Sequence, residues 1–333
     1  MGSLIERSPE ARAWVDAAIA AQEGGKAYSR IAGSVVWSDA RDSSGKVLLP
    51  IDPSDLVAKI NVEPFPLLRE HDPGRPIGKV LGAETFKTTD GQTFVAAILG
   101  FYDATVLHSF QALGLDPDIS SPPPSELPPL PDNFRLLLAA DPKEVESSWL
   151  ELIARDAHVP IEIQERSHNS AEAAQQLVLI GVTFTVLVWD PFVKAFAEEA
   201  GKDAYKIARD GLKALIGRVG DLANPIVEIQ SYQQGCTVSF MLRGKNVAQH
   251  YKAHALLQDA ALRAHHLIAT MLASNLRPRR LVYEFRLEDD LWAPSFVELE
   301  DGRLVSDTLI LVAAETLPTG LSLGLTVESR PDE

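Results

Sequence analysis

Short apolar runs separated by polar turn sequences recur from about residue 31 to residue 102, which is the pattern of a β-rich region. The expected strands are residues 34–37, 46–49 and 93–99. Sequences rich in aspartate and glycine, which are typical of turns, separate these runs. Helical spacing of apolar residues predicts helices over 11–21 and 52–60. The first third is therefore predicted to be β-rich, with short helices before and between the strands.

A proline-rich segment follows this region. Residues 103–113 are predicted to form a helix that ends at Gly114, because glycine favours helix ends. Residues 116–132 have the sequence DPDISSPPPSELPPLPD, with seven prolines. Proline lacks a backbone N–H and fixes φ, so this density excludes a helix or a central strand. We predict a loop or an extended linker there.

The middle of the chain predicts a strand–helix–strand unit, then a buried strand, then helices. The strand–helix–strand unit is expected at residues 134–138, 144–157 and 159–164. Residues 177–189 carry no charge, but these 13 positions fall short of the roughly 20 that a membrane-spanning helix needs. Their β-branched and aromatic residues favour a buried strand. Helical spacing over 191–219, interrupted by Gly201, predicts two helices or one kinked helix.

The last third predicts a hairpin, a long helix and three more strands. The hairpin strands are residues 226–232 and 237–242, joined through Gln233, Gln234 and Gly235, and the helix covers 246–273. The later strands are expected at 280–287, 295–299 and 304–313. The fold class is therefore α+β, with a β-rich, barrel-like first domain and an α+β second domain.

The domain boundary is expected between residues 165 and 175, where the sequence is polar and has no periodic pattern. This places an N-terminal extension at 1–30, a β-rich domain at 31–168 and an α+β domain at 169–333. A chain of 333 residues with 46% hydrophobic residues has enough length and apolar content for two ordinary cores.

Charge and cysteine content narrow the partners and the compartment. The chain has 31 basic and 46 acidic residues, and its formal charge of −15 repels phosphate backbones and anionic lipid headgroups. We therefore expect neither a nucleic-acid nor a membrane partner. Cys236 is the only cysteine, so no internal disulfide forms, and the first twenty residues lack the pattern of a secretory signal. Both features favour a cytoplasmic protein.

His71 is the first candidate for chemistry, because it ends an apolar run and precedes a rigid turn, as a catalytic base would. The surrounding order of motifs resembles the prohead, or capsid-maturation, serine proteases of tailed phages. The motifs are Pro66-Leu67-Leu68-Arg69-Glu70-His71-Asp72, then Pro76-Ile77-Gly78-Lys79-Val80, and a strand like residues 94–99. The resemblance covers roughly residues 30–121. It implies that His71 is the catalytic base and that a serine follows about fifty residues later.

Ser120 and Ser121 lie 49 and 50 positions after His71 and so fit that implied spacing. A serine hydroxyl is a weak nucleophile until an imidazole within hydrogen-bond reach takes its proton. Pro122, Pro123 and Pro124 follow at once and remove N–H groups that an oxyanion hole would use. The sequence does not select the third catalytic residue, which would orient the imidazole, from Asp141, Glu144 and Glu146. Loss of catalysis also stays open.

Other candidate sites are weaker. His250 and His254 lie four residues apart on the expected helix, a spacing that could bind zinc, and His265 and His266 follow. No glutamate follows His250 as a zinc protease requires, so exposed helix histidines are the favoured interpretation. Cys236 is expected to be a small apolar strand residue rather than a reactive thiol. Neither a metal nor an organic cofactor is implied.

Three functions follow from these patterns. The first is a serine endopeptidase that acts on a protein partner or on itself through His71 and Ser121 or Ser120. The second is an inactive protease-like scaffold that binds a protein partner, with the proline-rich segment in extended polyproline geometry as its docking element. The third is an effector whose residues 177–219 rearrange to attack a membrane. Homo-oligomerisation stays open.

Overall fold

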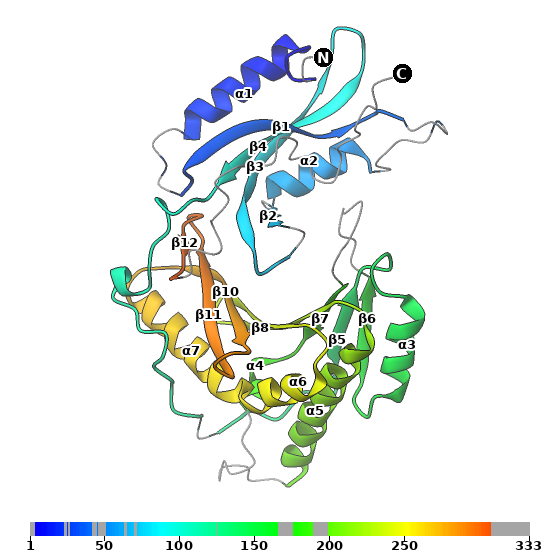
Figure 1. Ribbon diagram of the computed structural model, residues 1–333, viewed down its shortest axis with the longest axis vertical. Helices are drawn as coiled ribbons and strands as arrows, with labels where there is room; N and C mark the ends of the chain where they lie inside the picture. Colours follow the sequence, from blue (N-terminus) through cyan, green and yellow to red (C-terminus); the bar gives the residue numbers. More distant parts are fainter. Residues whose placement is uncertain are drawn as a thin grey trace. The chain divides into compact units, whose positions relative to one another are not determined.

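The structure is a computed structural model that describes residues 4–22, 25, 27–41, 45, 51–62, 65–69, 72–124, 126–165, 176–188 and 199–307. Contacts divide the described residues into two compact units, residues 4–107 (unit 1) and 108–307 (unit 2). Each unit contains a β-sheet and helices (Figure 1). The expected α+β class is therefore confirmed. The division falls between Leu107 and His108 rather than between residues 165 and 175, because strands on both sides of the expected boundary pair in one sheet.

Unit 1 is a four-stranded antiparallel sheet with the strand order β1-β4-β3-β2. The strands are β1 (Arg30–Ser38), β2 (Pro66–Leu68), β3 (Pro76–Lys87) and β4 (Thr93–Phe101). Helix α1 (Pro9–Gln22) packs on one face and α2 (Pro53–Val62) on the other (Figure 1). The expected strand at 46–49 lies outside the described residues.

Strand β4 explains why the sequence shows a continuous apolar run rather than a strict alternation. Phe94, Ala96 and Ile98 pack with α1, whereas Val95 and Ala97 pack on the side of α2. Both faces of the central strand are therefore buried, and every position of the run is apolar.

Unit 2 is built on an eight-stranded mixed sheet with the order β12-β11-β10-β9-β8-β7-β5-β6. Its strands are β5 (Leu136–Ala140), β6 (Ile161–Glu165), β7 (Gln176–Gly181), β8 (Pro225–Gln233), β9 (Cys236–Arg243), β10 (Pro278–Arg286), β11 (Leu291–Leu299) and β12 (Leu304–Val305). Its helices are α3 (Ser147–Asp156), α4 (Phe184–Leu187), α5 (Glu199–Arg218), α6 (Val247–Ala255) and α7 (Leu257–Ala273). Strand β5 precedes α3 in the sequence and β6 follows it. The two strands pair in parallel, as the strand–helix–strand prediction requires.

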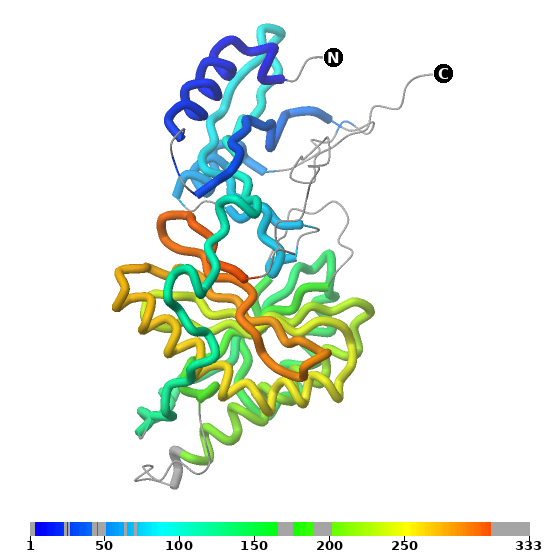
Figure 2. Tube along the Cα trace, turned by 60° about the vertical axis from the view of Figure 1, so that its left-hand side comes forward, coloured from blue at the N-terminus to red at the C-terminus, as the bar shows by residue number. Residues whose placement is uncertain are grey.

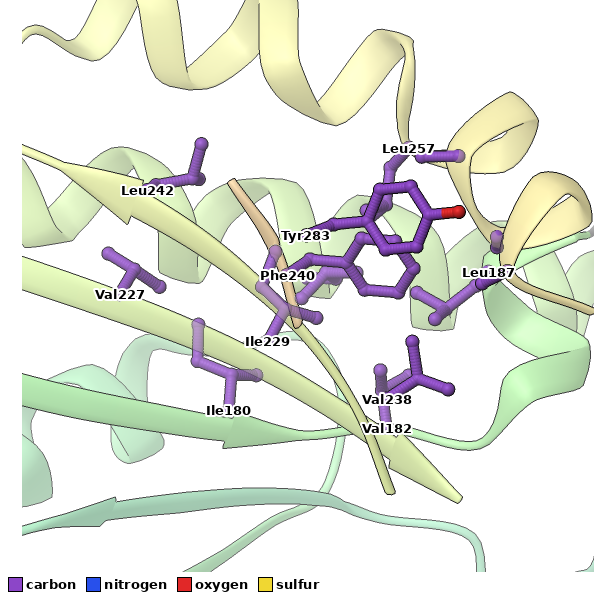
Figure 3. Packing of buried hydrophobic residues seen from close by; sticks show 14 of the residues in the cluster. Ile180, Val182, Leu187, Val227, Ile229, Val238, Phe240, Leu242, Leu257 and Tyr283 are labelled. Atoms are coloured by element: carbon purple, nitrogen blue, oxygen red, sulfur yellow. The ribbon is translucent and has the colours of Figure 1, made fainter. Parts of the chain in front are cut away.

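The helices of unit 2 lie on one face of this sheet and share its core (Figure 1). Alternate residues of neighbouring strands point toward the helices, as Figure 3 shows for Ile229, Phe240 and Tyr283 beside Leu187 and Leu257. The hairpin between β8 and β9 was correctly predicted, and its turn places Gln234 and Gly235 at positive φ values of 48° and 86°.

Two predicted helices differ in the structure. Residues 103–113 form only a 3₁₀ turn over Gln111–Leu113, which Gly114 ends at a φ of 68°. Asp103 caps a local turn by accepting from the N–H of Thr105 at 2.7 Å, and His108 pairs with β12 instead of continuing a helix. The expected helix over 246–273 is divided at Leu256, which separates α6 from α7.

The apolar run 177–189 is also shorter as a strand than predicted. Strand β7 ends at Gly181, and the buried helix α4 follows. Helix α5 passes through Gly201 without a break, while residues 189–198 lie outside the described part of the chain. In the part of the chain that the structure describes, every helix is too short or too polar to cross a membrane.

Gly78, in the motif that follows His71, is required by backbone packing. A Cβ atom at Gly78 would lie 2.1 Å from the carbonyl oxygen of Gly100 on β4, which no side-chain movement can relieve. Gly82, on the same strand, has Asn61 Oδ1 at 3.6 Å as its nearest neighbour, an ordinary contact.

We predict that Gly78→Ala lowers the free energy of unfolding by about 1–3 kcal/mol, because the added methyl group overpacks two backbones. Gly82→Ala is the matched control and is expected to change it by less than about 1 kcal/mol. Urea denaturation followed by circular dichroism measures both. Equal effects of the two substitutions would contradict the close approach of β3 to β4.

Candidate functional site

The loop that carries His71 is defined by the residues on either side of it, since Glu70 and His71 lie outside the described residues. The backbone N–H of Arg69 donates to the carbonyl of Arg75 at 2.9 Å, and that of Asp72 donates to Arg69 at 2.9 Å. The buried Asp72 accepts from the N–H of Gly74 at 2.8 Å through Oδ1. The aspartate of the His-Asp motif therefore shapes the turn.

Ser120 and Ser121 belong to unit 2, whereas the loop around His71 belongs to unit 1. The exposed Ser120 donates its hydroxyl to the carbonyl of Ser121 at 3.3 Å. The N–H of Ser121 donates to the carbonyl of Leu262 on α7 at 3.3 Å. Over the described residues, neither hydroxyl is hydrogen-bonded to a histidine.

The backbone around these serines is poor in free donors. The N–H of Ser121 is already bonded to α7, and the three prolines that follow it have none. An oxyanion hole needs N–H groups aimed at the developing negative charge. The segment just after Ser121 therefore supplies no such group.

The three acidic candidates for orienting the histidine take part in local structure. Asp141 is buried and accepts from the N–H of Lys143 at 2.9 Å. Glu144 accepts from the N–H of Leu177 at 3.2 Å, which fastens the chain before α3 to β7. Glu146 accepts from the hydroxyl of Ser148 at 3.2 Å, beside the start of α3. Each carboxylate thus has a role within unit 2.

Residues 116–132, which we call the strap, run alongside α7 (Figures 1 and 2). Ser125 is the one position of the strap outside the described residues. Besides the bond from Ser121 to Leu262, the hydroxyl of Tyr205 on α5 donates to the carbonyl of Pro128 at 2.7 Å. Leu127 and Leu130 are partly buried against the core of unit 2. The strap is therefore attached to both α7 and α5.

The histidines of α6 are buried, contrary to the expectation that they are exposed. His250 is 2% exposed and His254 is 7% exposed. Nδ1 of His250 lies 3.4 Å from the carbonyl oxygen of Ile216 on α5. Burial lowers the pKa of His254 to about 4, and Arg209 and Lys213 add to the effect. His254 is thus a neutral ring in the contact between α5 and α6 at neutral pH.

His265 stacks on Phe184 with ring centroids 5.4 Å apart. The described residues contain no group of three histidine, cysteine, aspartate or glutamate side chains that could hold a metal ion. Cys236 is buried in the core of unit 2, and desolvation raises the pKa of its thiol to about 12. This thiol is therefore protonated and a poor nucleophile, as the sequence indicated.

One polar group escaped the sequence analysis, namely a buried carboxylate in the middle of the large sheet. Glu228 on β8 is 3% exposed, and it accepts from the hydroxyl of Ser239 at 2.6 Å and from Arg280 at 3.1 Å. These residues lie on the face opposite the helices, and the Arg280 guanidinium sits 5.9 Å from the ring centre of Phe296. The only sequence signal was charge within strands that are otherwise apolar. The group is a buried carboxylate that is paired with a cation and with a hydroxyl.

We predict that His254 makes the protein acid-sensitive between pH 6.5 and about 4. Below pH 6.5 the unfolded chain binds a proton at His254, whereas the folded chain does so only near its pKa of about 4. The contribution of His254 to the free energy of unfolding is therefore fully present above pH 6.5. As the pH falls below 6.5, the free energy of unfolding decreases by at most about 1.4 kcal/mol per pH unit. Urea unfolding at several pH values should show a shallower slope for His254→Leu than for the wild type. Identical slopes would contradict this assignment.

Comparison with protein-family models, with curated proteins and with solved structures finds no match for this chain. The candidate function therefore depends on the chain's own residues and their geometry. These observations favour the strap as the candidate site, because Pro128, Pro129 and Pro131 are exposed while the backbone is bonded to α7 at Ser121 and to α5 at Pro128.

Proposed function

We propose that this chain is a protein-binding module whose docking segment is the strap. The observation that carries the proposal is the arrangement of its second half. Leu127 and Leu130, three positions apart, pack against the core of unit 2, while Pro128, Pro129 and Pro131 are exposed. A polyproline II helix has three residues per turn, so this spacing gives one attached edge and one outward edge of proline rings.

Both attachments lower the cost of binding a partner. The bonds of Ser121 to α7 and of Pro128 to α5 hold the strap extended before any partner arrives. A segment that is already ordered loses little conformational entropy on binding. The partner that fits is a domain with an aromatic-lined groove for polyproline geometry. Asp116, Asp118, Glu126 and Asp132 favour a groove with a basic rim.

In this proposal unit 1 is a protease-like scaffold that has lost catalysis, although its described strands form an open four-stranded sheet and not the expected barrel. The resemblance to the prohead proteases supports the ancestry of the loop around His71. The bonded N–H of Ser121 and the three prolines after it support the loss of a working oxyanion hole. The role of unit 1 is then to present or assemble the module on a protein partner.

A serine endopeptidase is the second candidate, favoured by the exposure of Ser120. In that mechanism His71 would take the proton of Ser120 or Ser121, and the hydroxyl would attack a peptide carbonyl. His71 would return the proton to the amine as the peptide C–N bond breaks, and water would then hydrolyse the acyl-enzyme ester to release the second product and regenerate the serine. This candidate requires N–H donors from outside the strap.

We predict that a polyproline-binding WW or SH3 domain with a basic groove binds the full chain. Pro128→Ala combined with Pro129→Ala should weaken binding about tenfold, because two outward rings are lost. Pro142→Ala, at an exposed position outside the strap, is the control and should leave affinity unchanged. Isothermal titration calorimetry measures all three proteins. The docking role fails if none of a panel of such domains binds, or if the strap variant binds as well as the control.

We further expect that a fluorophosphonate probe, which reacts with activated serines, does not label Ser120 or Ser121. Mass spectrometry of the treated chain locates any label. Labelling of either serine that disappears in His71→Ala would overturn the inactive assignment and establish the endopeptidase candidate.

A further inference from the structure

The eight-stranded sheet of unit 2 has two edges that differ in their hydrogen bonding. At one edge, the N–H of His108 donates to the carbonyl of Leu304 at 3.1 Å, and the N–H of Ser306 donates to the carbonyl of His108 at 2.7 Å, so His108 pairs with β12. At the other edge, no strand of the described residues pairs with the outer side of β6 (Figure 1). Strand β6 is therefore an edge strand of five residues.

The hydrogen bonds between β5 and β6 show which backbone groups of β6 are already in use. The N–H of Leu136 donates to the carbonyl of Pro160 at 2.9 Å, and the parallel register continues from there without a bulge. Alternate residues of a strand in such a ladder bond to the same neighbour. The backbone groups of Glu162 and Gln164 therefore follow that of Pro160 and bond to β5.

The other three residues of β6, namely Ile161, Ile163 and Glu165, direct their N–H and C=O groups to the free edge. Ile161 packs against the core of unit 2 on the side of the helices, so the side chains of Ile163 and Glu165 lie on that side too. Ile163 is 37% exposed, and β6 contains neither a proline nor a lysine, which protect many edge strands from pairing. Over the described residues, this edge can therefore accept another strand.

We propose that β6 pairs in antiparallel orientation with β6 of a second copy of this chain, about a two-fold axis at Ile163. In this register Ile163 faces its own counterpart, and Ile161 faces Glu165 of the partner subunit. Each outward residue then exchanges hydrogen bonds with the residue directly opposite, so every outward N–H and C=O group of both edges is used. The two sheets join into one continuous sheet through an isologous interface, in which both copies use the same surface.

Charge and hydrogen bonding select this register over its neighbours, because directly opposed like charges destabilise an antiparallel pair. With the axis at Ile163, Glu162 faces Gln164 of the partner subunit, whose amide can donate to the carboxylate. Within one chain, the amide of Gln164 already donates to Glu162 at 3.1 Å, and Arg135 lies 3.7 Å from the same carboxylate. An axis at Glu162 would oppose two glutamates. An axis at Gln164 would place Ile161 beyond the end of the partner's strand.

Helix α3 lies beside β6 at this end of the sheet (Figure 1). A two-fold axis perpendicular to the sheet keeps the helices of both copies on the same face, so α3 flanks the junction from each side. Leu152 on α3 is 37% exposed and adds apolar surface there. An edge of five residues with one flanking helix is small for an interface, so we expect a weak dimer with a Kd of about 1–100 µM. This inference does not depend on the proposed role of the strap.

Sedimentation velocity of the full chain between about 1 and 300 µM should show monomer converting to dimer. Gln164→Glu places a glutamate opposite Glu162 on both sides of the axis and should weaken dimerisation about three- to tenfold. Gln111→Glu adds the same charge at an exposed position outside β6 and should have no effect. Glu162→Lys combined with Gln164→Glu sets opposite charges across the axis and should restore dimerisation. Circular dichroism checks that each variant is folded.

Disulfide cross-linking tests the register directly, because the native Cys236 is buried. Ile163→Cys places the two thiols on residues whose Cα atoms are about 5.5 Å apart, within the range of a disulfide, so mild oxidation should give a covalent dimer. Gln164→Cys is the matched control. In this register its two Cα atoms are about 7–8 Å apart, at the limit of a disulfide or beyond it, so it should cross-link far more slowly. Non-reducing gel electrophoresis measures both rates.

Three results would overturn the inference. The chain could remain monomeric up to about 300 µM, well above the expected Kd. The Gln164→Glu variant could dimerise as tightly as the Gln111→Glu control. Finally, Gln164→Cys could cross-link as fast as Ile163→Cys, which would show that any dimer uses a different register or a different surface.

Discussion

The eight-stranded sheet of unit 2 buries one face under its helices, and the features that we connect with function are positioned by that packing. Phe240 lies 5.5 Å from both Tyr283 and Trp292, measured between ring centres, at the middle of this core. The indole N–H of Trp292 donates to the carbonyl of Ala253 at 2.9 Å and so connects β11 to α6. With α5, α6 and α7 held on the sheet, the strap can attach to α7 through Ser121 and to α5 through Pro128.

The opposite face of the sheet contains a buried charge, and a buried charge needs a partner. Glu228 is paired with Arg280 and Ser239 within neighbouring strands, which satisfies the carboxylate without help from a helix. Arg243 and Glu284 form a second ion pair on adjacent strands. Such pairs fix which residues face each other across the strands, since a shift of one residue would leave a buried charge alone.

Much of the fold was predictable from local patterns, whereas long-range contacts were not. The β8–β9 hairpin was predicted because Gln234 and Gly235 form a turn of two residues, and the strap because proline excludes regular structure. The prediction of a helix over 103–113 was wrong because His108 pairs with Val305, almost two hundred positions away. The strap serines were found from a resemblance, yet their attachment to Leu262 depends on tertiary packing. The prediction that His250 and His254 are exposed was also wrong because of a long-range contact, since α5 covers them.

In the proposed function, the strap binds a partner protein as an extended docking segment, and no catalytic cleft takes part. This proposal requires that Ser120 and Ser121 belong to a docking segment and are not nucleophiles. The most direct measurement is the distance from the His71 ring to each serine Oγ in an experimental structure. The account predicts that neither oxygen comes near the roughly 3 Å of a productive hydrogen bond. A distance close to 3 Å, with N–H donors beside the serine, would contradict it.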